Sequence, residues 1–95
     1  MTLQQLRHTR EQILQVAARH GAANVRVFGS LARGDTHAAS DVDLLVDMAP
    51  DRTLMDLGGL LVELQETLNS PVDVATERML RPKVREQALR DAVPL

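Results

Sequence analysis

The sequence contains no cysteine, tryptophan or tyrosine, and Phe28 is its one aromatic residue. Without cysteine the protein has no disulfide, thiolate metal ligand or cysteine nucleophile, which suits a reducing compartment. A surface that stacks nucleic-acid bases is not expected, because such surfaces are built from aromatic side chains. No apolar run reaches the roughly 18 residues of a membrane span, and the opening MTLQQLRHTR lacks the apolar segment of a signal peptide. We therefore expect a cytoplasmic protein without direct membrane or nucleic-acid contacts.

The composition that remains is typical of a folded domain. The chain has 95 residues, of which 44% are hydrophobic and 25% charged, so we expect a single domain over residues 1–95. The net charge of −2 conceals an uneven distribution, because ten acidic residues fall within positions 35–77 and only one basic residue accompanies them. Such a block can be a solvated surface or a cation site. The positions of its acids favour the cation site.

The spacing of apolar residues predicts helices and strands in alternation. A helix is expected over residues 2–20, a strand over 24–28, a helical turn capped by Ser30 and closed by Gly34, and a strand over 42–46. A second long helix is expected from 54 to about 69, with an inward stripe of Leu54, Leu57, Leu61, Leu64 and Leu68.

A strand over 71–76 follows, and then a helical segment that is interrupted at Pro82 and continues to about Asp91. Its inward residues are expected to be Val84, Ala88 and Leu89. This order predicts an α+β fold in which a small mixed sheet is flanked by helices.

Asp41 and Asp43 are two residues apart on a predicted strand, so their carboxylates project from the same face. Neighbouring carboxylates repel one another unless a cation lies between them, and Mg²⁺ prefers oxygen ligands of this kind. Most such pairs are ordinary surface acids. The pair therefore needs support from the residues around it.

That support comes from Gly29 and Ser30, where a strand runs into a helical turn. A helix start with glycine offers backbone N–H groups and close approach to phosphate oxygens. A phosphate cradle beside a carboxylate pair is the minimum equipment for binding a nucleoside triphosphate with its metal. Asp73, between Val72 and Val74, is either a third carboxylate of this site or an exposed acid on a one-sided strand.

The segment GSLARGDTHAASDVD, residues 29–43, resembles the signature of the DNA polymerase beta nucleotidyltransferase superfamily, in which Gly-Ser is followed after ten residues by Asp-x-Asp. The short chain is similar to the minimal nucleotidyltransferases, which pair with HEPN-domain toxins in toxin and antitoxin modules. The resemblance extends from about Asn24 to Ala75 and implies the polymerase-beta-like fold.

The resemblance also implies a role for each matching residue. Gly29 and Ser30 would hold the β- and γ-phosphates of ATP, and Arg33 would help to neutralise the triphosphate, unless it serves the helix surface. Asp41, Asp43 and Asp73 would bind two Mg²⁺ ions, and Asp73 would help to deprotonate the attacking hydroxyl. The implied reaction is a two-metal in-line displacement.

The implied acceptor is a tyrosine of the cognate HEPN ribonuclease toxin, which would receive AMP and be neutralised. We expect a hetero-oligomer of the two proteins. Two other functions remain open, namely an antitoxin that masks the toxin by contact alone and a transferase for a small hydroxylated molecule. A neighbouring gene for a HEPN protein would favour the toxin over the small molecule.

The remaining polar residues are not expected to carry the chemistry. The three histidines, among them His37, lack a paired ligand spacing, although His37 and Ser40 lie between cradle and carboxylates. Asp35 and Asp47 flank the site and are expected to be solvated or to support it. The basic segment from Arg78 to Arg90 is either a solvated helix face or a surface for a partner.

Overall fold

One mixed sheet organises the computed structural model of the chain, which describes residues 1–35 and 42–95. Its strand order is β3-β2-β1-β4. The strands are β1 (Ala22–Phe28), β2 (Val42–Met48), β3 (Val72–Ala75) and β4 (Val93–Pro94). Strand β1 is antiparallel to β2 and to β4, whereas β2 and β3 are parallel. The expected α+β fold with a small mixed sheet is thus confirmed.

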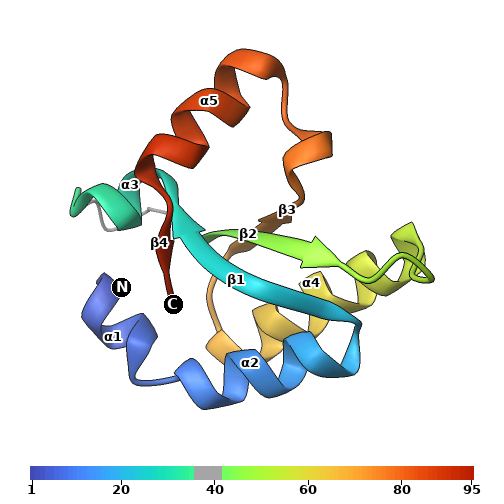
Figure 1. Ribbon diagram of the computed structural model, residues 1–95. Helices are drawn as coiled ribbons and strands as arrows, with labels where there is room; N and C mark the ends of the chain where they lie inside the picture. The colour runs from blue at the N-terminus through green and yellow to red at the C-terminus, as the bar shows by residue number, and fades with distance from the viewer. Residues whose placement is uncertain (36–41) are drawn as a thin grey trace.

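The helices lie on both sides of this sheet (Figure 1). They are α1 (Leu3–Arg7), α2 (Arg10–Arg19), α3 (Gly29–Arg33), α4 (Leu54–Leu68), the 3₁₀ helix η1 (Glu77–Met79) and α5 (Pro82–Asp91). Helices α2 and α4 cover one face, and the segment of η1 and α5 arches over the other. Across residues 1–35 and 42–95, no helix has the length and apolar character needed to cross a membrane.

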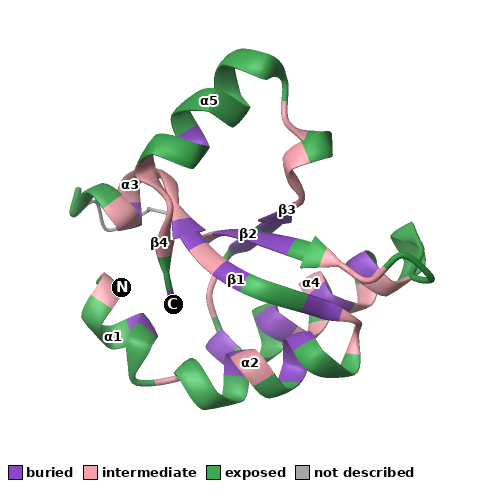
Figure 2. Cartoon of the chain, in the orientation of Figure 1, coloured by how far each residue is buried: buried purple, intermediate pink, exposed green. Residues whose placement is uncertain are grey.

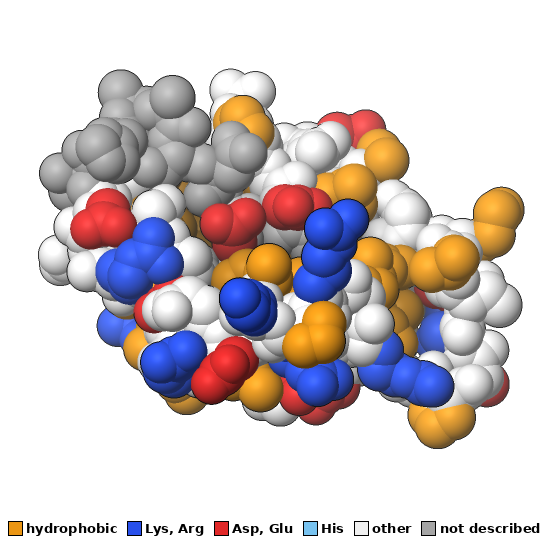
Figure 3. Space-filling view, turned by 90° about the horizontal axis from the view of Figure 1, so that it is seen from above, with side chains coloured by type: hydrophobic (Ala, Val, Ile, Leu, Met, Phe, Trp, Pro, Cys, Tyr) orange, Lys and Arg blue, Asp and Glu red, His pale blue; other side chains and the backbone are white. Residues whose placement is uncertain are grey.

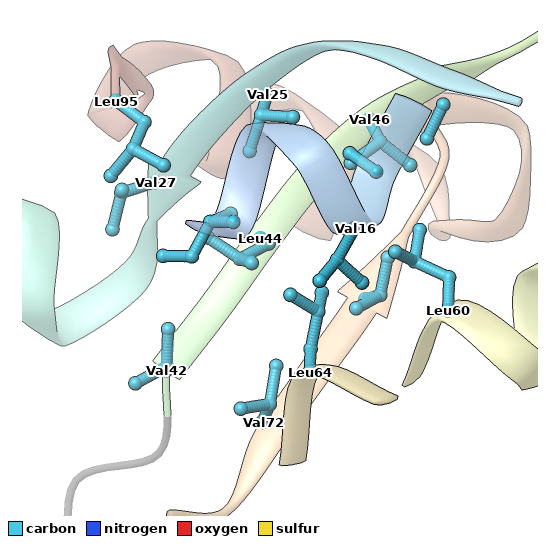
Figure 4. Close-up of a cluster of buried hydrophobic side chains, with 14 of the residues drawn as sticks. Val16, Val25, Val27, Val42, Leu44, Val46, Leu60, Leu64, Val72 and Leu95 are labelled. Carbon is cyan, nitrogen blue, oxygen red and sulfur yellow. The ribbon is translucent and has the colours of Figure 1, made fainter. Parts of the chain in front are cut away.

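The hydrophobic core lies between the sheet and the pair α2 and α4 (Figure 4). Alternate residues of β2 point into it, and Val42, Leu44 and Val46 are all at most 1% exposed. Burial is concentrated on these inner faces, whereas most of α5 is exposed (Figure 2). The opposite face of β2 therefore carries Asp43, Leu45 and Asp47, and this face holds the candidate site.

The single helix expected over residues 2–20 is wrong, because the chain forms two helices separated at His8 and Thr9. The hydroxyl of Thr9 donates to the Leu6 carbonyl at 2.7 Å, and the Thr9 backbone N–H donates to the same oxygen at 3.0 Å. A threonine side chain that bonds the preceding turn in this way competes with the regular helix pattern. The break follows from this local competition.

The buried leucine stripe of α4 differs from the expected one at its two edges. Leu57, Leu64 and Leu68 are buried as expected, but Leu54 is 77% exposed, and Leu60 is fully buried instead. Leu61 is only partly buried. Leu54 and Leu61 lie at one edge of the stripe at 100° per residue, and Leu60 at the other, so a small rotation of the helix exchanges them.

The C-terminal segment departs from expectation in part. The expected interruption near Pro82 is present, because η1 ends at Met79 and α5 runs from Pro82 to Asp91. Pro82 is itself the first residue of α5, where the missing N–H of proline costs nothing. Ala88 is buried as expected, but Val84 and Leu89 are 50% and 44% exposed. The last residues return to the sheet as β4, where Val93 pairs with Val27. A strand of two residues leaves no periodic signal in a sequence.

Candidate active site

The register of three strands aligns Phe28, Asp43 and Asp73 in one row across the sheet. Phe28 of β1 pairs with Asp43 of β2, and Asp43 pairs with Asp73 of β3. Neighbouring strands lie about 4.8 Å apart, and residues in parallel register project from the same face. The carboxylates of Asp43 and Asp73 therefore stand side by side on the face away from α2 and α4.

The next row of residues on the same face, formed by Arg26, Leu45 and Ala75, fixes the position of the strands that carry these carboxylates. Leu45 pairs with Arg26 on one side and with Ala75 on the other. Leu45 is fully buried and Ala75 is 8% exposed. Since both belong to regular strands, the sheet holds the backbone of Asp43 and Asp73 rigidly, and their side chains reach toward solvent from a fixed base.

Gly29 lies against Asp43 where β1 turns into α3. Its φ is +74°, a left-handed conformation that residues with a Cβ rarely adopt. A Cβ placed on residue 29 would stand 2.5 Å from Oδ2 of Asp43. Only glycine lets the backbone pass this close to the carboxylate. The expected closeness of the glycine turn to the acidic strand is thereby present in the structure.

Ser30 lies in the first turn of α3, and the expectation that it caps this helix is wrong. Phe28 occupies the cap position in extended conformation and makes no side-chain cap hydrogen bond. The reason is that Gly29 already adopts the turn, so the helix starts one residue earlier. Among the described residues the Ser30 hydroxyl has no hydrogen-bond partner.

Arg33 closes α3 and connects it to α5. Its Nη1 donates to Asp91 Oδ2 at 2.6 Å and its Nε to Asp35 Oδ2 at 3.2 Å. Hydrogen bonds to Asp91 and then to Asp35 raise the pKa of Arg33 above its ordinary value. Sequence reasoning missed Asp91, because an acid at the end of a distant helix carries no signal of this contact. Gly34 follows in the left-handed conformation and ends the helix, as expected.

Asp41 lies outside the described residues, as do His37 and Ser40. In the ranges 1–35 and 42–95, no three acidic or histidine side chains converge into a metal-binding group. Asp43 and Asp73 nevertheless fit a divalent cation, because they offer paired carboxylates on one face beside the backbone of Gly29, which has no side chain of its own.

The two flanking acids have other partners. Asp35 pairs with Arg33, and Asp47 accepts from Arg26 Nη2 at 2.9 Å and from Asn24 Nδ2 at 2.9 Å. Seen from the side of α5, acidic side chains lie next to basic and apolar ones (Figure 3). The described part of the site is thus a row of two carboxylates, a glycine turn and a short helix held by Arg33.

Comparison with known proteins agrees with this geometry. The profile of the nucleotidyltransferase domain family matches residues 9–95. The candidate protein adenylyltransferase MJ0435 of Methanocaldococcus jannaschii is 34% identical over 84 residues, which cover 88% of this chain and 90% of that protein. The protein adenylyltransferase MntA of Thermococcus cleftensis is 32% identical over 79 residues, covering 83% of this chain and 80% of that protein.

Solved structures share the fold. A structure described as a candidate minimal nucleotidyltransferase superposes with a TM-score of 0.86 at 50% identity and covers 100% of this chain and 97% of its own. A toxin-antitoxin structure with AMP-PNP superposes with a TM-score of 0.74 at 22% identity, covering 88% of this chain and 69% of that one. The second likeness concerns the fold alone.

Proposed function

Because the chain belongs to the nucleotidyltransferase domain family, we propose that it is a protein adenylyltransferase that transfers AMP from ATP to a tyrosine of a cognate HEPN ribonuclease toxin. In this function it is the antitoxin of the pair. The observation that carries the proposal is the row of Asp43 and Asp73 beside the Gly29 turn. The two adenylyltransferase relatives support the choice of a protein acceptor.

The glycine turn and α3 would hold the triphosphate. Gly29 leaves the backbone open to a phosphate oxygen, and the Ser30 hydroxyl would donate a hydrogen bond to another. Arg33, fixed by Asp91 and Asp35, would add positive charge at the end of the same short helix. These contacts would present the α-phosphate to the face that carries the carboxylates.

The carboxylates would carry the chemistry. Two Mg²⁺ ions, held by Asp41, Asp43 and Asp73 when bound, would neutralise the phosphates and stabilise the entering and leaving oxygens. Asp73 would accept the proton of the acceptor hydroxyl. The hydroxyl oxygen would then bond to the α-phosphorus as the bond from that phosphorus to the β-phosphate bridge breaks. AMP remains on the acceptor, and pyrophosphate leaves.

The acceptor cannot be a tyrosine of this chain, which has none. AMP on a toxin tyrosine adds a bulky anion, which would repel RNA from a nearby ribonuclease site. The function of the antitoxin would thus be covalent and would outlast its contact with the toxin.

Intact mass spectrometry of the two proteins tests this function. The chain, the purified HEPN-domain protein and ATP are mixed with and without Mg²⁺, and both proteins are weighed. We expect the HEPN protein alone to gain the mass of AMP, only with Mg²⁺, and not with the Asp41→Asn plus Asp43→Asn variant. A toxin that is inhibited without any gain in mass would favour masking by contact. A gain in mass that survives both substitutions would also contradict the proposed mechanism.

A further inference from the structure

A cavity lies beyond the carboxylate row, at the far end of β2. It has a volume of about 640 Å³ and is bounded by the end of β2, the start of α4, η1 and the first turns of α5. We call it the distal pocket. Apolar side chains of Met48, Leu54 and Met79 line it together with Arg52, Arg78 and Arg85. Of the described residues assigned to ATP or metal, namely Gly29, Ser30, Arg33, Asp43 and Asp73, none lines the pocket.

The charges that line the distal pocket do not cancel. Its acids, Asp47 and Glu77, both pair with Arg26, at 2.9 and 3.6 Å, and the Arg26 side chain is only 13% exposed. Arg52 is likewise neutralised by Asp56 at 3.2 Å. Arg78 and Arg85 form no ion pair with any residue that the structure describes. Counted with Arg26 and Asp56, the pocket has four arginines and three acids, so it has a net charge of +1 and two arginines without an ion pair among the described residues.

The apolar residues of the distal pocket indicate what class of molecule it receives. Leu54 is 77% exposed and Met79 is 52% exposed, an unfavourable arrangement for large side chains in a free monomer. Methionine and arginine are enriched at protein interfaces, and flexible methionines adapt to a partner surface. The described lining residues include no aromatic ring that could stack a nucleotide base. This composition favours a protein segment over a second nucleotide.

We propose that the distal pocket docks the acceptor protein, through an acidic segment that inserts an apolar side chain between Leu54 and Met79 and pairs with Arg78 and Arg85. This proposal rests on the proposed function. Asp47 at the pocket lies four residues beyond Asp43 on β2, about 13 Å at the rise of a strand. A segment held there would deliver a hydroxyl of the same protein to Asp73.

The basic segment offers a matched control for this proposal. Arg78 and Arg85 line the pocket, whereas Arg81 and Lys83 belong to the same segment, are also exposed and do not line it. Arg78→Glu plus Arg85→Glu and Arg81→Glu plus Lys83→Glu therefore make the same change in charge within eight residues. Leu54→Asp removes the apolar anchor at an exposed helix start, where an acidic residue is tolerated.

Binding of the purified HEPN-domain protein to each variant is measured by calorimetry without ATP, so that the result does not depend on transfer. We expect the Arg78 and Arg85 variant to bind at least about tenfold more weakly, Leu54→Asp to weaken binding as well, and the control pair to remain within about twofold. Equal weakening by both charge variants, or by neither, would overturn the docking proposal.

Two further readouts separate this proposal from the proposed function. The Kd for ATP with Mg²⁺ should be unchanged in all three variants, and a loss of ATP binding in the Arg78 and Arg85 variant would make the pocket a nucleotide site and overturn the proposal. Where the wild-type chain binds the HEPN protein but adds no AMP, the proposed function fails and docking stands. Where AMP is added by the pocket variants at the wild-type rate and with the wild-type KM for the HEPN protein, docking fails and the function stands.

Discussion

The backbone of Gly29 passes so close to Asp43 that a Cβ on residue 29 would stand 2.5 Å from the Asp43 carboxylate oxygen Oδ2. Glycine is required here for two separate reasons, the left-handed φ of +74° and this contact. The turn that would hold phosphate and the acid that would hold metal are therefore built as one unit. Both lie at the end of the sheet where Phe28, Asp43 and Asp73 are in register.

Gly29→Ala is expected to lower the rate of AMP transfer by much more than its loss of stability explains. The left-handed backbone costs alanine about 1–2 kcal/mol, and the new methyl group would displace the Asp43 carboxylate, lowering the transfer rate by roughly 100-fold. Gly34→Ala is the control, because Gly34 also has a positive φ, +82°, but no atom of the described residues lies within 4 Å of its added Cβ. Urea denaturation and transfer rates should show similar stability losses and very different activities. Similar activities would refute the close contact.

Leu60→Ala is expected to destabilise the fold far more than Leu54→Ala. Leu60 is fully buried in the core and Leu54 is 77% exposed on the same helix. The first change should cost about 2–5 kcal/mol and the second less than about 0.5 kcal/mol, as measured by urea denaturation. A comparable cost for the two leucines would place the buried stripe of α4 elsewhere.

Arg33→Gln is expected to raise the KM for ATP, because the guanidinium stands at the end of the helix that would hold the triphosphate. It should also lower the Tm, since the hydrogen bonds to Asp91 and Asp35 are lost. Asp91→Asn is the matched change, which weakens the connection to α5 but leaves the positive charge in place. If both variants have a lower Tm and neither changes the KM for ATP, Arg33 stabilises the fold and does not contact the triphosphate.

Stability should fall in acid as Glu63 is protonated. Hydrogen bonds from His20 and then Arg19 lower the pKa of Glu63 below its usual value of 4.5. Ionised Glu63 therefore stabilises the fold above that pH, and the contribution is lost as the pH falls through the lower pKa of the folded state. Tm measured between pH 6 and about 3 should decline less for Glu63→Gln than for wild type. Glu66→Gln, on the same helix, should leave the decline unchanged.

Much of the fold could be predicted because its signals are local. The valine and leucine strands, the glycine turn and the leucine helix each have their own periodicity, and the alternation of Val72, Asp73 and Val74 correctly set which side of β3 is buried. The break at Thr9 and the strand β4 could not be predicted, because one depends on a single side-chain hydrogen bond and the other on pairing with distant β1.

The candidate site divides in the same way. Gly29, Asp43 and Asp73 were expected from spacing and resemblance, and the structure brings them together. The role of Asp41 stays a prediction, since this residue lies outside the described ranges. The tie from Arg33 to Asp91 and the distal pocket are products of tertiary packing. Arg33 and Asp91 are 58 positions apart, and a contact over that distance leaves no pattern in the sequence.

The central claim is nucleotidyl transfer by the row of carboxylates, and the position of the transferred phosphate tests it most directly. The chain and the HEPN-domain protein are incubated with Mg²⁺ and ATP labelled at either the α- or the γ-phosphate, with wild type, Asp73→Asn and the control Glu66→Gln. We predict that the HEPN protein is labelled from the α-phosphate only, by wild type and Glu66→Gln but not by Asp73→Asn. Label from the γ-phosphate, or undiminished α-labelling by Asp73→Asn, would contradict the account.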